Sequence, residues 1–278
     1  MAENMKPSTN DEVLEVVKWA VAEQTPIEIL GHGSKRKLGR PTQTAYTVDL
    51  SGLSGVTLFE PEELILSAKA GTPLADIESL LDEHKQEFQF EPSDLGPVLG
   101  QAAGAGTLGG LVSTNICGPR RLKSGSARDH ILGIHAVSGR GEVFKSGGRV
   151  VKNVTGYDLS KGVTGAYGTL AFLTDITMNV LPLAETENTL VLSGLSDTDA
   201  MQAMATAMGS NAEVSGAAHL PSNVTGEGSQ TIFRLEGFAP SVAYRIENLG
   251  KILAHHRDQT RLNLSASQSI WKKVRDCS

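Results

Sequence analysis

The residues best suited to chemistry are the glycines and small polar side chains of two separate loops. The first loop is Gly31–Lys35, and the second is Gly104–Asn115. Backbone N–H groups in such loops form concave nests that bind anions, so two loops could hold the two phosphates of a pyrophosphate from opposite sides. Hydroxyl and amide groups add further donors at Ser34, Ser113, Thr114 and Asn115. The pattern predicts a site for a ligand that contains a diphosphate.

The second loop also contains a G-x-G-x-x-G motif, from Gly104 to Gly109. In a Rossmann fold this motif follows a buried strand and opens a helix. Residues 95–101, which precede it, contain a proline and two glycines and are typical of a loop. Asp129 lies at about the distance expected of a ribose-binding acid, so an NAD-dependent Rossmann enzyme remains an alternative. A glycine-rich Ω-loop without a ligand is the other alternative, although such long stretches are uncommon without a function.

The sequence identifies no catalytic acid or base. His130 and His135 flank an expected strand beside the second glycine loop, but a structural role is favoured even for them. Arg120 and Arg121 follow the same loop and could bind a substrate carboxylate, a ligand phosphate or a partner subunit. The remaining histidines in expected helices or strands are His84, His219, His255 and His256.

Composition excludes several classes of protein. The 278 residues include two cysteines, Cys117 and Cys277, without a C-x-x-C pair, and no H-x-H or carboxylate cluster, so no metal site is expected. The net charge is −6 and no basic stretch resembles a nucleic-acid-binding arm. Residues 1–11 lack the apolar core of a signal peptide, and no apolar run is long enough to span a membrane. We expect a cytoplasmic location, or a peripheral contact with a membrane through a larger complex.

The first part of the chain reads as an α+β unit. The capping-box spacing of Thr9 and Glu12 precedes an apolar stripe, which predicts a helix over residues 11–23. Thr72 as N-cap and Pro73 at the first helical position predict a second helix. Residues 91–115 are interrupted by glycine and proline and predict irregular structure. The expected strands cover residues 26–30, 46–50, 64–70, 131–137, 142–145, 150–155 and 169–180.

After Pro182 the pattern changes to alternating strands and helices. Strands are expected over residues 189–192, 212–220, 231–235 and 261–264, and helices over residues 196–208, 240–253 and 268–275. Without the last helix, the order βαββαβ is that of a ferredoxin-like unit. We therefore place a domain boundary near residue 184, with one domain over residues 1–184 and another over residues 185–278.

Six motifs, taken in order, resemble the vanillyl-alcohol oxidase/p-cresol methylhydroxylase (PCMH-type) family of FAD-binding proteins. Within that family they are most similar to the FAD-binding subunits of glycolate oxidases, over roughly residues 10–277. The motifs are Gly31–Lys35, Glu91–Gly96, Thr107–Asn115, Gly125–Gly133, Val151–Leu159 and Gly165–Leu170. Each motif is moderately specific by itself, whereas the ordered set is highly specific.

The resemblance implies two α+β subdomains with FAD between them and a cap domain that shapes the substrate side. The two glycine loops would hold the pyrophosphate and flank the flavin, Asp94 and Leu95 would lie near the ring, and residues 165–170 would lie near the adenosine. The cofactor-binding residues that it implies are Gly31, His32, Gly33, Ser34, Lys35, Asp94, Leu95, Thr107, Leu108, Gly109, Gly110, Ser113, Thr114, Asn115, Gly165, Gly168, Thr169 and Leu170.

Three features depart from the family pattern. His32 interrupts the usual glycine triplet and lies one residue from the place where some members attach FAD, so we expect non-covalent FAD. Ala171 replaces a common glycine. The chain stops at Ser278, where relatives continue, and we therefore expect the cap to be C-terminally incomplete.

The resemblance further implies the FAD-binding subunit of a glycolate oxidase or dehydrogenase complex. Such a subunit would oxidise a small 2-hydroxy acid to the 2-oxo acid by hydride transfer from the α-carbon to flavin N5. Its partners would be a second flavoprotein subunit and an iron–sulfur subunit, with no nucleic acid and no direct membrane insertion. The alternative is a subunit that holds FAD for structure or electron relay and performs no substrate chemistry.

Overall fold

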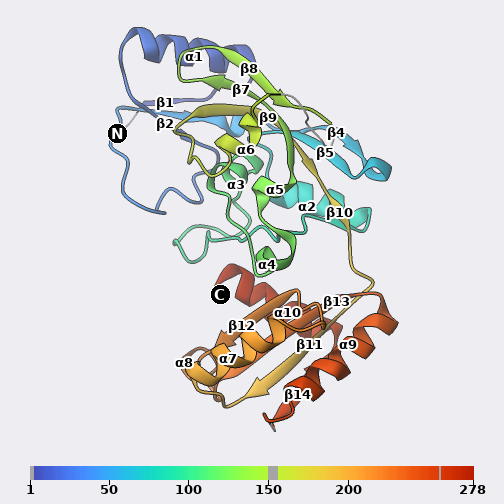
Figure 1. Cartoon of the computed structure of the whole chain (residues 1–278). Helices are drawn as coiled ribbons and strands as arrows, with labels where there is room; N and C mark the ends of the chain where they lie inside the picture. The colour runs from blue at the N-terminus through green and yellow to red at the C-terminus, as the bar shows by residue number, and fades with distance from the viewer. Residues whose placement is uncertain (1–2, 150–155, 257) are drawn as a thin grey trace. The chain divides into compact units, whose positions relative to one another are not determined.

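The computed structural model describes residues 3–149, 156–256 and 258–278. The chain divides into two compact units (Figure 1). Unit 1 contains residues 1–117 and 126–182, and unit 2 contains residues 118–125 and 183–278. The chain thus leaves unit 1 after Cys117, contributes a short segment to unit 2, and returns to unit 1 at Ser126.

A small parallel sheet with one covering helix forms the N-terminal part of unit 1. Its strand order is β1-β3-β2, with β1 at Glu3–Met5, β3 at Tyr46–Asp49 and β2 at Ile27–Leu30. Helix α1 (Asn10–Ala22) begins at the N-cap Thr9, whose hydroxyl accepts the Glu12 N–H at 3.2 Å, so the predicted helix is confirmed. Val13 and Val17 of α1 pack with Val48 of β3 in one buried cluster.

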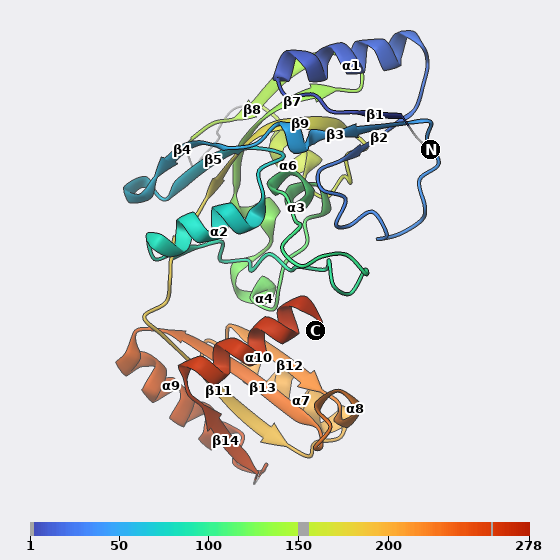
Figure 2. The same cartoon turned by 180° about the vertical axis from the view of Figure 1, so that it is seen from behind.

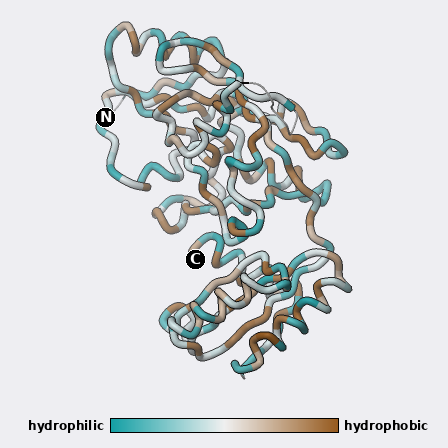
Figure 3. Tube along the Cα trace, viewed as in Figure 1, coloured by the Kyte–Doolittle hydropathy of each residue, from teal (hydrophilic) through white to brown (hydrophobic). Residues whose placement is uncertain are grey.

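A larger antiparallel sheet forms the centre of unit 1. The strand order is β4-β5-β9-β7-β8, with bounds Val56–Glu60, Ile65–Lys69, Ala171–Asn179, Ile131–Ser138 and Val143–Gly147. The strands expected over residues 131–137 and 142–145 are confirmed as the antiparallel pair β7–β8, and the Ser138 N–H donates to the Glu142 carbonyl at 2.9 Å across the turn that joins them. Leu66 and Ile176 of this sheet pack against Ile77 of α2 (Leu74–Glu83) and Leu111 of α3 (Leu108–Thr114). Hydrophobic segments follow these strands in Figure 3.

Short elements complete the described structure. In unit 1 they are 3-10 helices at Leu50–Gly52 and Pro61–Glu63, β6 (Gln86–Glu87), which pairs with β10 (Leu181–Pro182), α5 (Ala127–His130) and α6 (Leu159–Val163). In unit 2 they are α4 (Arg121–Ser124) and α8 (Ser222–Thr225).

The structure differs from the sequence-based expectations for unit 1 in three respects. The second glycine loop is irregular only to Thr107, because residues 108–114 form α3 with Thr107 as N-cap. The N-cap of α2 is Pro73, since the Thr72 hydroxyl donates instead to the Lys69 carbonyl at 2.7 Å. Strands β1 and β4 were not predicted: neither shows the alternation that marks a half-buried strand. The strand expected over residues 150–155 lies outside the described residues.

Unit 2 is a four-stranded antiparallel sheet with helices on both faces. The chain order is β11 (Thr186–Ser193), α7 (Asp197–Met208), β12 (Gly216–Leu220), β13 (Gln230–Gly237), α9 (Ala239–Ile252), β14 (Gln259–Leu262) and α10 (Leu264–Asp276). The order in the sheet is β12-β13-β11-β14. Helices α7 and α9 cover one face, and Figure 2 shows α10 on the opposite face.

Alternation along the strands explains why unit 2 has a core on each side of the sheet. Leu190 of β11 packs with Ala203 of α7 and Val242 of α9. The next residue, Val191, belongs to a separate cluster with Trp271 of α10. Successive strand residues point to opposite faces, so a single strand serves both cores.

Candidate functional site

A cavity of about 550 Å³ lies in unit 1, and both of its larger sheets contribute to the wall. Its size is in the range of small-molecule and cofactor sites. Strand β2 and the residues after it form one side, while the start of α3 and of β9 form another. The predicted residues that line it are Gly31, His32, Gly33, Ser34, Lys35, Thr107, Gly109, Gly110, Ser113, Thr114, Gly168 and Thr169.

The two glycine loops meet at Gly31 and Thr107. A Cβ atom built on Gly31 would overlap the Thr107 hydroxyl and would lie 2.9 Å from its Cγ2. Thr107 is buried, and its hydroxyl accepts the Gly110 N–H at 3.2 Å as the N-cap of α3. Only glycine therefore fits at position 31 while Thr107 caps the helix.

The first loop carries free backbone donors. Among the described residues, the N–H groups of residues 32–35 donate to no other protein atom, and Gly33 has a φ of +71° with open space beside its Cα. The amides at the start of α3 are already used, because Leu108 donates to Thr72 at 3.0 Å and Gly109 donates to Ala70 at 2.7 Å. The Leu108 and Gly109 amides are therefore not available to the anion nest expected from the two loops.

The expected hydroxyl donors are also reduced. The Thr114 hydroxyl donates to the Gly110 carbonyl at 2.7 Å, within its own helix. Ser113 lines the cavity from the same helix, and its carbonyl accepts the Tyr167 N–H at 2.8 Å. Ser34 is buried at the cavity wall. Of the expected hydroxyl groups, Ser34 and Ser113 therefore remain able to donate to a ligand.

Lys35 provides positive charge at the wall of the cavity. Its side chain is largely desolvated, which lowers the pKa of the ammonium group, while the charge of Asp94 acts in the opposite direction. Arg36, which also lines the cavity, donates from Nε to Glu28 at 3.1 Å and is paired with that carboxylate. A desolvated ammonium beside free backbone N–H groups fits an anionic ligand such as a diphosphate.

Six predicted residues do not line this cavity. The Asp94 carboxylate accepts N–H groups from Gly96 at 3.0 Å and Gly104 at 2.7 Å and so braces the loop between them. Leu108 is fully buried in the core of unit 1. Asn115 accepts the Arg128 N–H at 3.0 Å. Leu95, Gly165 and Leu170 complete the set that lies off the cavity wall.

Several residues of the wall were not predicted. Arg40 and Thr42 follow the first loop, and Ala70 and Tyr167 come from elsewhere in unit 1. The basic stretch from Ser34 to Arg40 beside the glycines was the available signal for the first pair. Tyr167 has a φ of +54°, an uncommon conformation for a bulky residue, which the amino-acid type alone did not indicate.

The other candidate residues do not line the cavity. His130 is buried, with Nδ1 at 2.9 Å from the Asn179 side-chain oxygen and its ring against Phe90. Arg120 pairs with Glu236 in unit 2. Among the described residues, no group of three His, Cys, Asp or Glu side chains could hold a metal ion. In the same part of the chain, no helix is both long and apolar enough to cross a membrane.

The chain is similar in sequence to a family of FAD-binding domains and to glycolate oxidase subunits. The family described as "FAD binding domain" matches residues 4–147. "Glycolate oxidase subunit GlcE" of Escherichia coli (strain K12) is 44% identical over 170 residues, which are 61% of this chain and 46% of the relative. "Glycolate oxidase subunit GlcD" of Bacillus subtilis (strain 168) is 26% identical over 186 residues, 66% of this chain and 38% of the relative.

Solved structures share the fold. An alkyldihydroxyacetonephosphate synthase has a TM-score of 0.78 at 16% identity, over 99% of this chain and 54% of that one. A p-cresol methylhydroxylase with substrate bound has a TM-score of 0.76 at 13% identity, over 98% of this chain and 61% of that one. The match to either glycolate oxidase subunit spans less than half of that subunit's length.

Proposed function

This chain belongs to the FAD-binding domain family, and from that premise we propose that it is the FAD-binding subunit of an enzyme complex that oxidises a small 2-hydroxy acid. The observation that carries the proposal is the cavity in unit 1, where the unused N–H groups of residues 32–35 lie beside the desolvated Lys35. The 44% identity to a glycolate oxidase subunit supports glycolate as the substrate.

The residues of the cavity suit the diphosphate of FAD. The first loop and Lys35 would bind the phosphates, Ser34 and Ser113 would donate hydrogen bonds, and Gly168 and Thr169 would lie on the adenosine side. The open space at Gly33 lets a ligand approach the backbone closely. FAD, when bound, supplies the redox chemistry by accepting a hydride from the substrate α-carbon at flavin N5. We infer that FAD is held without a covalent bond to His32.

Unit 2 is proposed to be a ferredoxin-like cap that shapes the substrate side. The sheet order β12-β13-β11-β14 and the chain order βαββαβ support this assignment. In domain terms, residues 1–184 would bind FAD and residues 185–278 would form the cap. The printed names of two relatives, which are both glycolate oxidase subunits, support a second flavoprotein subunit as partner. An iron–sulfur subunit would then receive the electrons.

A FAD-holding relay subunit is the second candidate. The observation in its favour is that Glu28, the one carboxylate on the described wall of the cavity, is already engaged in an ion pair with Arg36. Glycolate oxidation by the isolated, FAD-loaded chain would favour the enzymatic role. Activity that arises only after reconstitution with the partner subunits would favour the relay.

The visible absorption spectrum of the purified chain, recorded before and after acid precipitation, tests the proposal. We expect flavin bands that pass into the supernatant on precipitation, because the cofactor is bound without a covalent link. Bands that remain in the pellet would show covalent attachment and make His32 the first residue to substitute. Absence of flavin bands, even after incubation with FAD, would contradict the proposal.

A further inference from the structure

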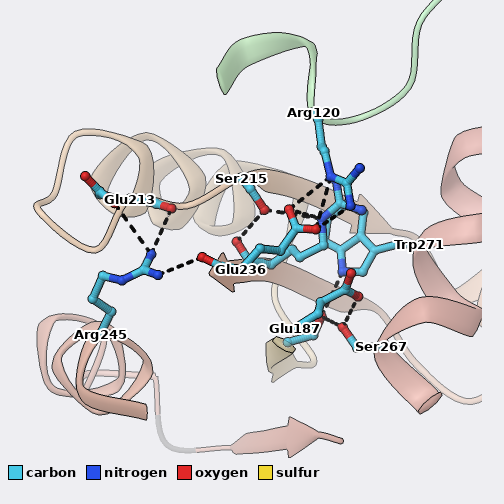
Figure 4. A network of polar contacts seen from close by, with 10 residues as sticks. Arg120, Glu187, Glu213, Ser215, Glu236, Arg245, Ser267 and Trp271 are labelled. Carbon is cyan, nitrogen blue, oxygen red and sulfur yellow. Dashed lines mark hydrogen bonds and ion pairs between the residues drawn. The ribbon is translucent and has the colours of Figure 1, made fainter. Parts of the chain in front are cut away.

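A buried ion pair anchors the segment that the chain inserts into unit 2. The Arg120 Nε atom lies 3.1 Å from both carboxylate oxygens of Glu236, and Nη2 of Arg120 also bonds Oε1 (Figure 4). The side chains are only 11% and 10% exposed. This two-nitrogen contact is specific to a guanidinium, because an ammonium cannot reproduce its planar fork.

Glu236 is held rigidly where Arg120 meets it. It lies on β13 next to Arg234, whose Nε is 3.3 Å from Glu236 Oε2 and whose guanidinium packs 4.6 Å above the Trp271 ring. Its backbone carbonyl accepts an N–H of Arg245 at 2.7 Å. Burial acts to raise the pKa of Glu236, but the charges of Arg234 and Arg120 outweigh it and hold the pKa below its usual value. The carboxylate is therefore an ionised, fixed partner.

The base of the same segment, where the chain leaves and re-enters unit 1, is joined by a hydrogen bond. Asn115, the C-cap of α3 with a φ of +52°, accepts the Arg128 N–H at 3.0 Å. This bond joins the residues just before the segment to those just after it. Helix α3 ends next to this closure and contributes Ser113 and Thr114 to the cavity wall. Only residues 115–119 separate the cavity-lining helix from Arg120.

We propose that Arg120 is a positioning residue whose pair with Glu236 links the tip of the 118–125 segment to β13 and so restrains the chain that follows the cavity-lining helix α3. The Asn115–Arg128 bond fixes the base of the segment, and the Arg120–Glu236 pair fixes its tip. Loss of the pair removes the bidentate contact at the tip of the segment and takes away one of the two arginines that face the buried Glu236 carboxylate. The inference rests on the proposed function only in taking the ligand of the cavity to be FAD.

Limited trypsin digestion of the full chain tests whether the tip of the 118–125 segment is held in place. Arg121 and Lys123 are exposed within the segment and remain as cleavage sites in Arg120→Met and Glu236→Gln. We expect both variants to be cut there at least ~10-fold faster than the wild type, because cleavage of a folded segment follows its local opening. Arg120→Lys should retain only part of the wild-type resistance to cleavage at these sites. Arg261→Met, an exposed arginine on β14, is the matched control and should leave the rate unchanged.

Mass analysis of the fragments separates the outcomes. Faster cleavage at residues 121 and 123, with unchanged cleavage in α9 and α10, would support the link. Unchanged cleavage at the segment would overturn it, and so would equal acceleration throughout unit 2, which would show that the pair serves only the folding of that unit. The FAD dissociation constant of Arg120→Met should also rise several-fold. A wild-type chain that fails to bind FAD would count against the proposed function, whereas the proteolysis result would still decide the link.

Discussion

Lys35 is a partly desolvated cation on the wall of a cavity that contains unused backbone donors. Burial lowers the pKa of this ammonium group, which means that the folded chain without a ligand disfavours its charged form. An anionic ligand supplies the opposite charge and reverses that preference. The same side chain is thus expected to cost stability in the empty protein and to contribute affinity in the loaded one.

Lys35→Met separates these two effects. Because burial disfavours the charged ammonium group, we expect the variant to gain about 1 kcal/mol in the free energy of unfolding without FAD. Its FAD affinity should fall by roughly 10- to 100-fold, because a charge-assisted hydrogen bond is lost. Urea unfolding and flavin fluorescence titration measure the two quantities. The control is Lys37→Met, since Lys37 is exposed and does not line the cavity. Equal FAD affinities for the Lys35 variant and the wild type would refute the role.

The contact between the first loop and α3 is the feature that builds the cavity at the level of elements. Thr107 caps α3 with its hydroxyl and simultaneously packs against the Cα of Gly31. The helix start and the loop are therefore fixed by one side chain. Glycine at position 31 is required by this close approach, and not by its own backbone angles.

Gly31→Ala should force these two elements apart. The added methyl group overlaps buried Thr107, so we expect a loss of about 1 to 3 kcal/mol in the free energy of unfolding and weaker FAD binding. Thermal or urea unfolding measures the loss. Gly139→Ala is the control, because its Cβ would meet nothing within 4 Å. In Gly31→Ala/Thr107→Ala the overlap is removed, so the two single effects should not add; simple additivity would show that Thr107 is not the cause.

At the scale of the whole molecule, a network of charged side chains beneath α10 of unit 2 makes the stability of the chain depend on pH. Burial raises the pKa of Glu187 to about 7, although the Ser267 hydroxyl, which donates to it at 2.5 Å, and the charge of Arg234 favour the ionised form. The folded chain therefore binds this proton more tightly than the unfolded chain. Its contribution to stability falls as pH rises from about 4.5 to about 7 and stays lost above that.

Glu187→Gln is expected to remove this dependence while Ser267 keeps an acceptor. Relative to the wild type, the variant should gain about 1 to 3 kcal/mol more at pH 8 than at pH 5. Urea unfolding at both pH values gives the difference, and Glu185→Gln, at an exposed position in the same region, is the control. A gain that is the same at both pH values would mean that Glu187 does not titrate in this range.

Local patterns in the sequence determined most of the helices and strands. The Thr9 cap and the apolar stripe after it predicted α1, and the pattern over residues 196–208 predicted α7, because caps and periodicity act over only a few residues. The composition of the first loop likewise indicated a nest, since free N–H groups follow from glycine and the absence of regular structure. The ordered motifs pointed to the FAD-binding family that residues 4–147 match.

Only the tertiary structure decided which donors remain for a ligand. The amides of Leu108 and Gly109 donate to the carbonyl groups of Thr72 and Ala70, which lie on a distant part of the chain. No local sequence pattern predicts that pairing. The insertion of residues 118–125 into unit 2 and the meeting of Arg120 with Glu236 are equally non-local. The sequence determined the elements and the kind of loop, because these depend on neighbouring residues. Packing decided the site, because a hydrogen-bonding group is available only when no distant group has already bound it.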